Sequence, residues 1–280
     1  MGLKVGFIGL GNIGRPMADN LMAPAFDLAV FDAVPAAAAH FEGRALIAGS
    51  PAEVARHAVL IGICVRDEND VSNVLHGPEG LLENCSPGAV IAVHSTIRPS
   101  TIRQIADAAL ARKVHVVDAP VSRGPAGVHA QKFVCMVGAE EAVFEQVRPL
   151  LEGFASDLIH AGTAVGAGMT LKLCNNLTTY IELSAAVEAF RLAEAGGLAP
   201  ELVRDVMTKA GTLTPSMRQF VEFLAIARPD IEQYRTRLEW TLSLANKDLD
   251  FALDLSREFG VTLPMTEMAR QTFAGAIGLE

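Results

Sequence analysis

Short apolar segments and segments of helical character alternate over the first 160 residues. The segments between the apolar runs, such as residues 100–111, place Ile102, Ile105 and Ala109 on one helical face. Strands that are apolar throughout and that alternate with helices are typical of a parallel sheet covered on both faces. This part of the chain is therefore predicted to be a doubly wound, mostly parallel α/β domain. The apolar runs that predict its strands cover residues 3–8, 28–31, 59–65, 89–93, 114–117 and 133–137.

The strand signals end where a long helical pattern begins. Residues 169–195 contain neither Gly nor Pro, and their apolar side chains recur at helical spacing. At about 1.5 Å per residue such a helix is roughly 40 Å long, which is enough to run from one domain into the next. Further helical patterns cover residues 215–228 and 236–258. We therefore predict an α/β domain over residues 1–163 and an all-helical domain over residues 164–280, joined by the long helix.

The first apolar run leads directly into the glycine-rich stretch GLGNIG, residues 9–14. Gly9 follows the predicted strand, Gly14 begins a helical pattern, and Asp32 closes the second predicted strand. In this arrangement a helix N-terminus receives a pyrophosphate, and the acid binds the ribose hydroxyls. Gly9 permits the turn, Gly11 lets the backbone approach the phosphates, and Gly14 lets helix and strand pack closely. The stretch therefore predicts a Rossmann-type dinucleotide site.

Asp32 also indicates which dinucleotide is bound. A 2′-phosphate would be repelled by a carboxylate, and no Lys or Arg follows Asp32 before Arg44. NAD is therefore favoured over NADP. The predicted cofactor contacts from this part of the chain are Gly9, Gly11, Asn12, Ile13, Gly14 and Asp32, with Val65 at the end of the third apolar run.

Composition excludes several classes of partner. The chain has 23 Lys and Arg residues against 32 Asp and Glu, a formal net charge of −9. This balance argues against nucleic acid or an anionic membrane as the main partner, although a local pocket can still bind a small anion. No apolar run is long enough to span a bilayer, and no leader peptide is recognisable. The four cysteines lack CxxC spacing, as is typical of thiols in a reducing compartment, so a cytoplasmic protein is expected.

No metal site is expected. The seven histidines are scattered without HxxxH spacing, and each is interpreted as a surface residue or a satisfied core residue. Asp67, Glu68 and Asp70 form an acidic cluster after the third apolar run. We interpret this cluster as a solvated loop near the adenine end of the dinucleotide.

Two later stretches carry polar groups at informative places. In GAGMTLKLCNN, residues 166–176, Lys172 and Asn176 are four residues apart and share one helical face. A lysine on this apolar helix start either snorkels to solvent or faces a cleft; the cleft is favoured, because the helix begins at the predicted domain junction. In VDAPVSRGPAG, residues 117–127, Ser122 and the N–H groups around Gly124 follow the fifth predicted strand and can donate hydrogen bonds to a carboxylate.

Four stretches together resemble one family. GFIGLGNIGRPMADNL, DAPVSRG, GAGMTLKLCNN and NKDLDFAL (residues 246–253) resemble, in order and spacing, the β-hydroxyacid dehydrogenases. That family includes 3-hydroxyisobutyrate dehydrogenase, tartronate semialdehyde reductase and, more distantly, 6-phosphogluconate dehydrogenase. The resemblance covers nearly the whole chain. It implies an NAD-dependent oxidoreductase that interconverts a small 3-hydroxy acid and its semialdehyde or 3-oxo acid by hydride transfer.

The resemblance also implies roles for individual residues. Lys172 is the catalytic acid and base, which a lysine can be near neutral pH if burial and a neighbouring cation lower its pKa. Asn176 positions the substrate, and Ser122 with the loop after it binds the substrate carboxylate. Lys247 helps to close the site over substrate and cofactor. The other implied positions are Ser95 and Thr96, near the nicotinamide ribose, and Asp248, as a structural partner.

Two features depart from the family pattern. Arg123 stands where the family usually has glycine. It either pairs with a surface acid or offers a bidentate fork to a second anionic group of the substrate. The sequence also stops at Glu280, before the usual final helical segment of the family.

Two alternative functions remain open. An imine or other carbonyl reductase of the same fold is disfavoured by Lys172, which imine-reducing relatives usually replace. A catalytically silent dinucleotide-binding module is disfavoured by the set of Ser122, Lys172 and Asn176. The apolar helical half favours a homodimer or homotetramer.

Overall fold

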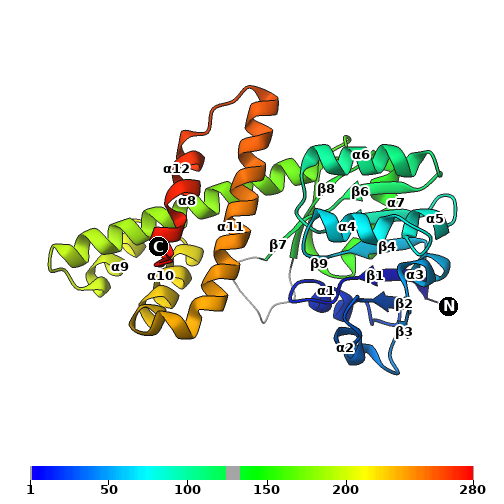
Figure 1. Ribbon diagram of the computed structural model, residues 1–280, viewed down its shortest axis with the longest axis horizontal. Coiled ribbons are helices and arrows are strands. Elements are labelled where there is room, and N and C mark those ends of the chain that lie inside the picture. Colours follow the sequence, from blue (N-terminus) through cyan, green and yellow to red (C-terminus); the bar gives the residue numbers. More distant parts are fainter. Residues whose placement is uncertain (1, 124–132, 280) are drawn as a thin grey trace. The chain divides into compact units, whose positions relative to one another are not determined.

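The computed structural model describes residues 2–123 and 133–279, with Arg123 described by its backbone alone. The chain forms two compact units, Met1–Lys172 and Leu173–Glu280. Figure 1 shows the α/β character of the first unit and the helical character of the second. No helix in the described part of the chain is long and apolar enough to cross a membrane.

A mostly parallel sheet forms the centre of the first unit. Its strands in the described residues are β1 (Leu3–Ile8), β2 (Phe26–Phe31), β3 (Leu46–Ile47), β4 (Leu60–Ile63), β5 (Val90–Val93), β6 (His115–Asp118), β7 (Val121–Arg123), β8 (Phe133–Gly138) and β9 (Ala155–Gly162). The order is β3-β2-β1-β4-β5-β6-β8-β7, and β9 pairs with β8. All pairs from β3 to β6 are parallel, so the carboxyl ends of these strands meet at one edge. The predicted doubly wound sheet is confirmed.

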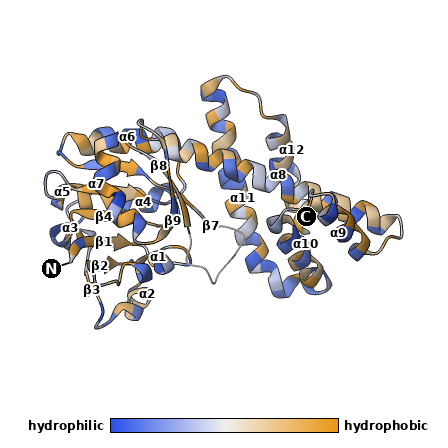
Figure 2. Ribbon diagram, turned by 180° about the vertical axis from the view of Figure 1, so that it is seen from behind, coloured by the Kyte–Doolittle hydropathy of each residue, from blue (hydrophilic) through white to orange (hydrophobic). Residues whose placement is uncertain are grey.

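Helices cover both faces of this sheet. On one face α1 (Gly14–Asn20) and α7 (Glu141–Glu152) pack against Phe7 and its neighbours. The other face, which includes Ile8, is covered by α3 (Pro51–His57), α4 (Glu68–Leu75), α5 (Leu81–Asn84) and α6 (Pro99–Leu110). The short α2 (Pro35–Ala38) adds Ala38 to the first face. Because both faces are buried, the central strands β1 and β4 are largely apolar, as their colour in Figure 2 shows.

Three strands are absent from the predicted set. β3 is a two-residue edge strand with both residues exposed, and β7 has three residues. β9 is longer, but its residues are exposed or half-buried and do not form an apolar run. Sheet pairing with β8, rather than local sequence, makes β7 and β9 strands.

The second unit is helical, as predicted. α8 (Ala167–Ala195) begins in the first unit and is followed by α9 (Pro200–Lys209), α10 (Pro215–Ala227), α11 (Ile231–Phe259) and α12 (Pro264–Ile277). Proline occupies the first position of α9, α10 and α12, where its missing N–H costs nothing. Gly260 ends α11 with a left-handed φ of 68°. The main core of this unit includes Leu183, Leu238 and Phe273.

One histidine lies deep in the first unit. His94, which follows β5, is 3% exposed and stacks on Phe7 at a centroid distance of 5.9 Å. Its Nδ1 donates to the carbonyl oxygen of Ala119 at 2.7 Å, whereas Nε2 has no hydrogen-bond partner among the described residues. The sequence interpretation of a satisfied core histidine is therefore correct for one ring nitrogen only. Burial lowers the pKa of His94 to about 4.

This burial predicts a specific acid sensitivity. The pKa of His94 is lower in the folded chain than the roughly 6.5 of an unfolded chain. Its contribution to stability is therefore complete above about pH 6.5 and is lost as the pH falls toward 4. Urea titrations at pH 7 and pH 5 measure how far the free energy of unfolding falls between these two pH values. This fall should be about 2 kcal/mol smaller in His94→Phe than in the wild type.

The exposed His76 supplies the matched control, since His76→Gln should leave this pH dependence unchanged. A wild-type pH dependence in His94→Phe would show that His94 does not cause the acid sensitivity.

Candidate active site

Three glycines shape the turn after β1, each for a different reason. Gly9 has a φ of 93°, and a Cβ there would lie 2.2 Å from the carbonyl oxygen of Cys64. A Cβ on Gly14 would lie 1.9 Å from the carbonyl oxygen of Gly9, so only glycine fits at the start of α1. A Cβ on Gly11 would meet nothing within 4 Å. Protein packing therefore does not require Gly11, and its open side suits a phosphate group that approaches the backbone.

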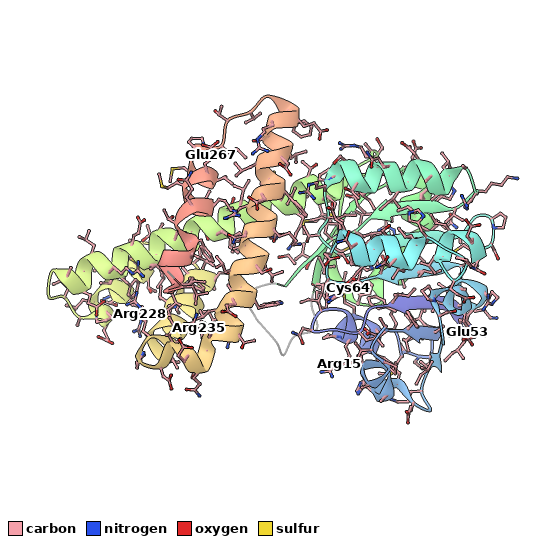
Figure 3. All side chains as sticks on the ribbon, viewed as in Figure 1. Arg15, Glu53, Cys64, Arg228, Arg235 and Glu267 are labelled. Carbon is pink, nitrogen blue, oxygen red and sulfur yellow. The ribbon has the colours of Figure 1, made fainter. Side chains whose placement is uncertain are left out.

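The other residues of this turn divide between core and solvent. Ile13 is half-buried against the core beneath α1, whereas Asn12 is exposed. Arg15, in the first turn of α1, is also exposed. Figure 3 labels Arg15 together with Cys64, which follows β4 and underlies the turn. The solvent side of the turn is thus formed by backbone and by polar side chains.

Asp32 is fixed beside this turn by two backbone donors. Its Oδ2 accepts from the N–H of Leu10 at 2.6 Å, and its Oδ1 accepts from the N–H of Val34 at 2.8 Å. A carboxylate accepts about four hydrogen bonds, so acceptor capacity remains for two ribose hydroxyls. The Arg66 guanidinium lies close enough to Asp32 to interact with its charge. It is paired with Asp70, with Nε 2.6 Å from Oδ2. The arrangement fits the ribose of a dinucleotide.

Val65 and Ser95 are joined directly to each other. The N–H of Val65 donates to Ser95 Oγ at 2.8 Å, and that hydroxyl donates to the carbonyl oxygen of Val65, also at 2.8 Å. The single hydroxyl proton of Ser95 is therefore used within the protein. Ser95 ties the ends of β4 and β5 together, and the half-buried Thr96 follows it at the same edge.

The predicted carboxylate-binding loop begins in β7. Ser122 is half-buried, and its backbone pairs with Val134 of β8. Arg123 pairs with Phe133 through its backbone, and Gly124 lies outside the described residues. In the sheet, β8 therefore lies between the start of this loop and β6.

The start of α8 is bound to the end of β6 by a buried aspartate. Asp118 is 0% exposed, and its Oδ1 accepts from the N–H of Gly166 at 2.7 Å. Its Oδ2 accepts from the N–H of Met169 at 2.6 Å. Burial raises the pKa of Asp118 to about 6, although the backbone N–H donors oppose this rise. Lys172, one turn beyond Met169, is buried and belongs to the same unit.

A second buried carboxylate organises the polar residues of the helical unit. Asn176 Nδ2 donates to Asp248 Oδ2 at 2.7 Å, and the Tyr180 hydroxyl donates to the same oxygen at 3.4 Å. Lys247 Nζ lies 3.1 Å from Asp248 Oδ1 as an ion pair without hydrogen-bond geometry. Burial, and then the charge of Asp248, raises the pKa of Tyr180, so this hydroxyl remains a donor at neutral pH.

The structure therefore collects the predicted residues into two groups. One group lies along the carboxyl edge of the parallel sheet, and the other surrounds Asp248 in the helical unit. α8 carries members of both groups, Lys172 and Asn176. Sequence reasoning missed Asp118, although a charged residue at the end of the apolar run HVVD was an available signal. No group of three or more potential metal ligands occurs in residues 2–123 and 133–279.

Comparison with known proteins bears on the whole chain. The family model of the NAD binding domain of 6-phosphogluconate dehydrogenase matches residues 4–162. The model described as NAD-binding of NADP-dependent 3-hydroxyisobutyrate dehydrogenase matches residues 166–278. The two matches follow one another in the order of the two units.

Individual relatives agree with these models. The chain is 35% identical over 280 residues to the 2-(hydroxymethyl)glutarate dehydrogenase of Eubacterium barkeri, covering 99% of this chain and 91% of that one. It is similar in fold to Mycobacterium tuberculosis 3-hydroxyisobutyrate dehydrogenase, solved with L-serine, at a TM-score of 0.80 and 26% identity, covering 100% of this chain and 98% of that one. An imine reductase variant from Myxococcus stipitatus, 15% identical, has a TM-score of 0.69 over 99% of this chain and 94% of that one. This last likeness concerns the fold alone. The chain belongs to the β-hydroxyacid dehydrogenase family.

Proposed function

We propose that this protein is an NAD-dependent oxidoreductase that interconverts a small 3-hydroxy acid and its semialdehyde or 3-oxo acid. The observation that carries the proposal is the placement of Lys172. The buried lysine follows a helix start bound to the end of β6, at the sheet edge that also holds the glycine turn and Asp32. The dehydrogenase names of the relatives support the same reaction class. In this proposal residues 1–163 hold the dinucleotide, and residues 164–280 complete the substrate site.

Each polar residue then has a defined task. Lys172 Nζ accepts the proton of the substrate hydroxyl during oxidation and returns it during reduction. Asn176 hydrogen-bonds the substrate, and its amide is oriented because Nδ2 donates to Asp248. Ser122 and the backbone N–H groups around Gly124 bind the substrate carboxylate, while Lys247 closes the site. Bound nicotinamide supplies the hydride chemistry. Thr96 lies toward the nicotinamide ribose.

The decisive experiment for this proposal is the Lys172→Ala variant. A spectrophotometric screen of 3-hydroxy acids and their semialdehydes first identifies a substrate. Lys172→Ala should then lower kcat by about 10²–10⁴-fold, because the general acid and base is lost. NADH binding, measured by fluorescence titration, should persist.

Lys209→Ala serves as the control, because Lys209 is an exposed lysine of α9 that pairs with Asp205. Near-wild-type turnover by Lys172→Ala would remove Lys172 from the mechanism. NAD binding without turnover of any hydroxy acid would instead favour the silent dinucleotide-binding module. A preference for imines would favour the imine reductase alternative.

NAD is proposed as the cofactor in preference to NADP. The Asp32 carboxylate, held by the N–H groups of Leu10 and Val34, would repel a 2′-phosphate bound beside it. We therefore expect kcat/KM for NADH to exceed that for NADPH by about tenfold or more, equivalent to ~1.4 kcal/mol. Asp32→Ala should narrow this ratio, and Asp27→Asn, at the exposed amino end of β2, should not. Higher initial rates with NADPH at equal concentration would overturn the assignment.

Arg123 is proposed to recognise a second anionic group on the substrate. The support is that a 35% identical relative is named for 2-(hydroxymethyl)glutarate, a dicarboxylate. Arg123→Gly, which restores the usual family residue, should raise KM about tenfold for dicarboxylate hydroxy acids, because a charge-assisted hydrogen bond is lost. KM for a monocarboxylate such as 3-hydroxyisobutyrate should change less than about twofold. Equal effects on both substrate classes would refute this role of Arg123.

We further propose a cytoplasmic homodimer or homotetramer. α9 buries none of its residues, and its Leu202 and Val206 are 56% and 64% exposed. Leu192 and Leu198, just before it, are 77% and 54% exposed. Exposed apolar side chains gathered in this part of the sequence are typical of a subunit contact. The four cysteines are free thiols, which suits a reducing compartment.

A further inference from the structure

We propose that Asp118 is a positioning residue for catalysis: its carboxylate fixes the start of α8 and thereby the place of Lys172. This inference rests on the proposed role of Lys172. Asp118 lies 48 residues before Gly166 and 51 before Met169, so it is not a local cap. It acts as the N-terminal cap of α8 from another element.

Gly166, the residue before α8, has no side chain that could cap the helix. The stretch VGAGMT, residues 165–170, has no Ser, Asp or Asn before the first helical residue. The first N–H groups of a helix have no partner within the helix and need one when they are buried. Asp118 supplies both of its oxygens to this end of the helix. Replacing one of these two acceptor oxygens should therefore loosen the first turn.

The backbone around this carboxylate is shaped to admit it. A Cβ on Gly138, at the end of β8, would lie 2.3 Å from Asp118 Oδ1. A Cβ on Gly168, in the first turn of α8, would lie 2.3 Å from the carbonyl oxygen of Met136 and 3.0 Å from Asp118 Oδ2. Two glycines on different elements thus leave the space that the carboxylate and the helix start share.

Lys172 depends on this contact through the helix itself. It lies three residues after Met169, one turn along α8 and about 4.5 Å farther along its axis. A shift or rotation of the first turn therefore moves the ammonium group by a similar amount. Misplacement of a reacting group by about 1 Å can reduce a rate by about 10²-fold. Asp118 thus affects the reaction without touching substrate or dinucleotide.

The test is Asp118→Asn, which keeps the side-chain shape but replaces one acceptor oxygen with an NH₂ group. We expect kcat to fall by about 10²-fold, while the Kd for NADH and KM change less than about threefold. Amide exchange at residues 166–172 should accelerate, and exchange in α1 should not. Gly168→Ala crowds the same contact but retains the carboxylate. It should likewise lower kcat while the Kd for NADH changes less than about threefold.

Thr214→Val is the matched control. Thr214 also accepts a backbone N–H at a helix N-terminus, that of Met217 in α10 at 3.2 Å, and α10 carries none of the proposed site residues. This variant should retain kcat within about twofold of the wild-type value. A kcat near wild type in Asp118→Asn, or a parallel loss of kcat and NADH binding, would overturn the inference.

If Asp118→Asn does not fold, Gly168→Ala decides, and an unchanged kcat in that variant overturns the inference. The inference and the proposed function fail separately. Activity in Lys172→Ala would refute the role of Lys172 itself. Loss of activity in Lys172→Ala, together with full activity in a folded Asp118→Asn variant, would refute only the positioning role of Asp118.

Discussion

The contact between the Asp118 carboxylate and the first turn of α8 is the interaction on which the proposed site depends. A buried carboxylate is costly, and so are unpaired N–H groups at a buried helix start. Each satisfies the other here, at 2.7 and 2.6 Å. The result is a fixed connection between the end of β6 and the helix that carries Lys172 and Asn176.

Parallel pairing explains why residues far apart in the sequence gather at one edge. The glycine turn and Asp32 follow β1 and β2, whereas Val65 and Ser95 follow β4 and β5. Backbone and side-chain hydrogen bonds then fix these ends to one another. In the helical unit Asp248 has a comparable part, because one carboxylate contacts Asn176, Tyr180 and Lys247. The helical group is thus organised by one buried acid, and the sheet-edge group by hydrogen bonds between strand ends.

Features that are encoded locally could be predicted from the sequence. The apolar runs predicted the parallel strands, the stretch without Gly or Pro predicted α8, and the GLGNIG turn predicted the sharp bend at Gly9. Features that depend on distant partners could not. β9 lacks an apolar run and exists through pairing with β8, and the cap of α8 comes from Asp118. The hydrogen bond from the Ser95 hydroxyl to the carbonyl oxygen of Val65 likewise joins residues 30 positions apart, and no local pattern indicates it.

The central claim is that Lys172 exchanges the proton of the substrate hydroxyl. The most direct measurement is a crystal structure of the wild-type enzyme with NAD and an identified hydroxy acid. The account predicts that Lys172 Nζ lies about 2.6–3.2 Å from the substrate hydroxyl oxygen, with α8 still capped by Asp118. A hydroxyl bound by another acid or base, with Lys172 directed away from the substrate, would contradict it.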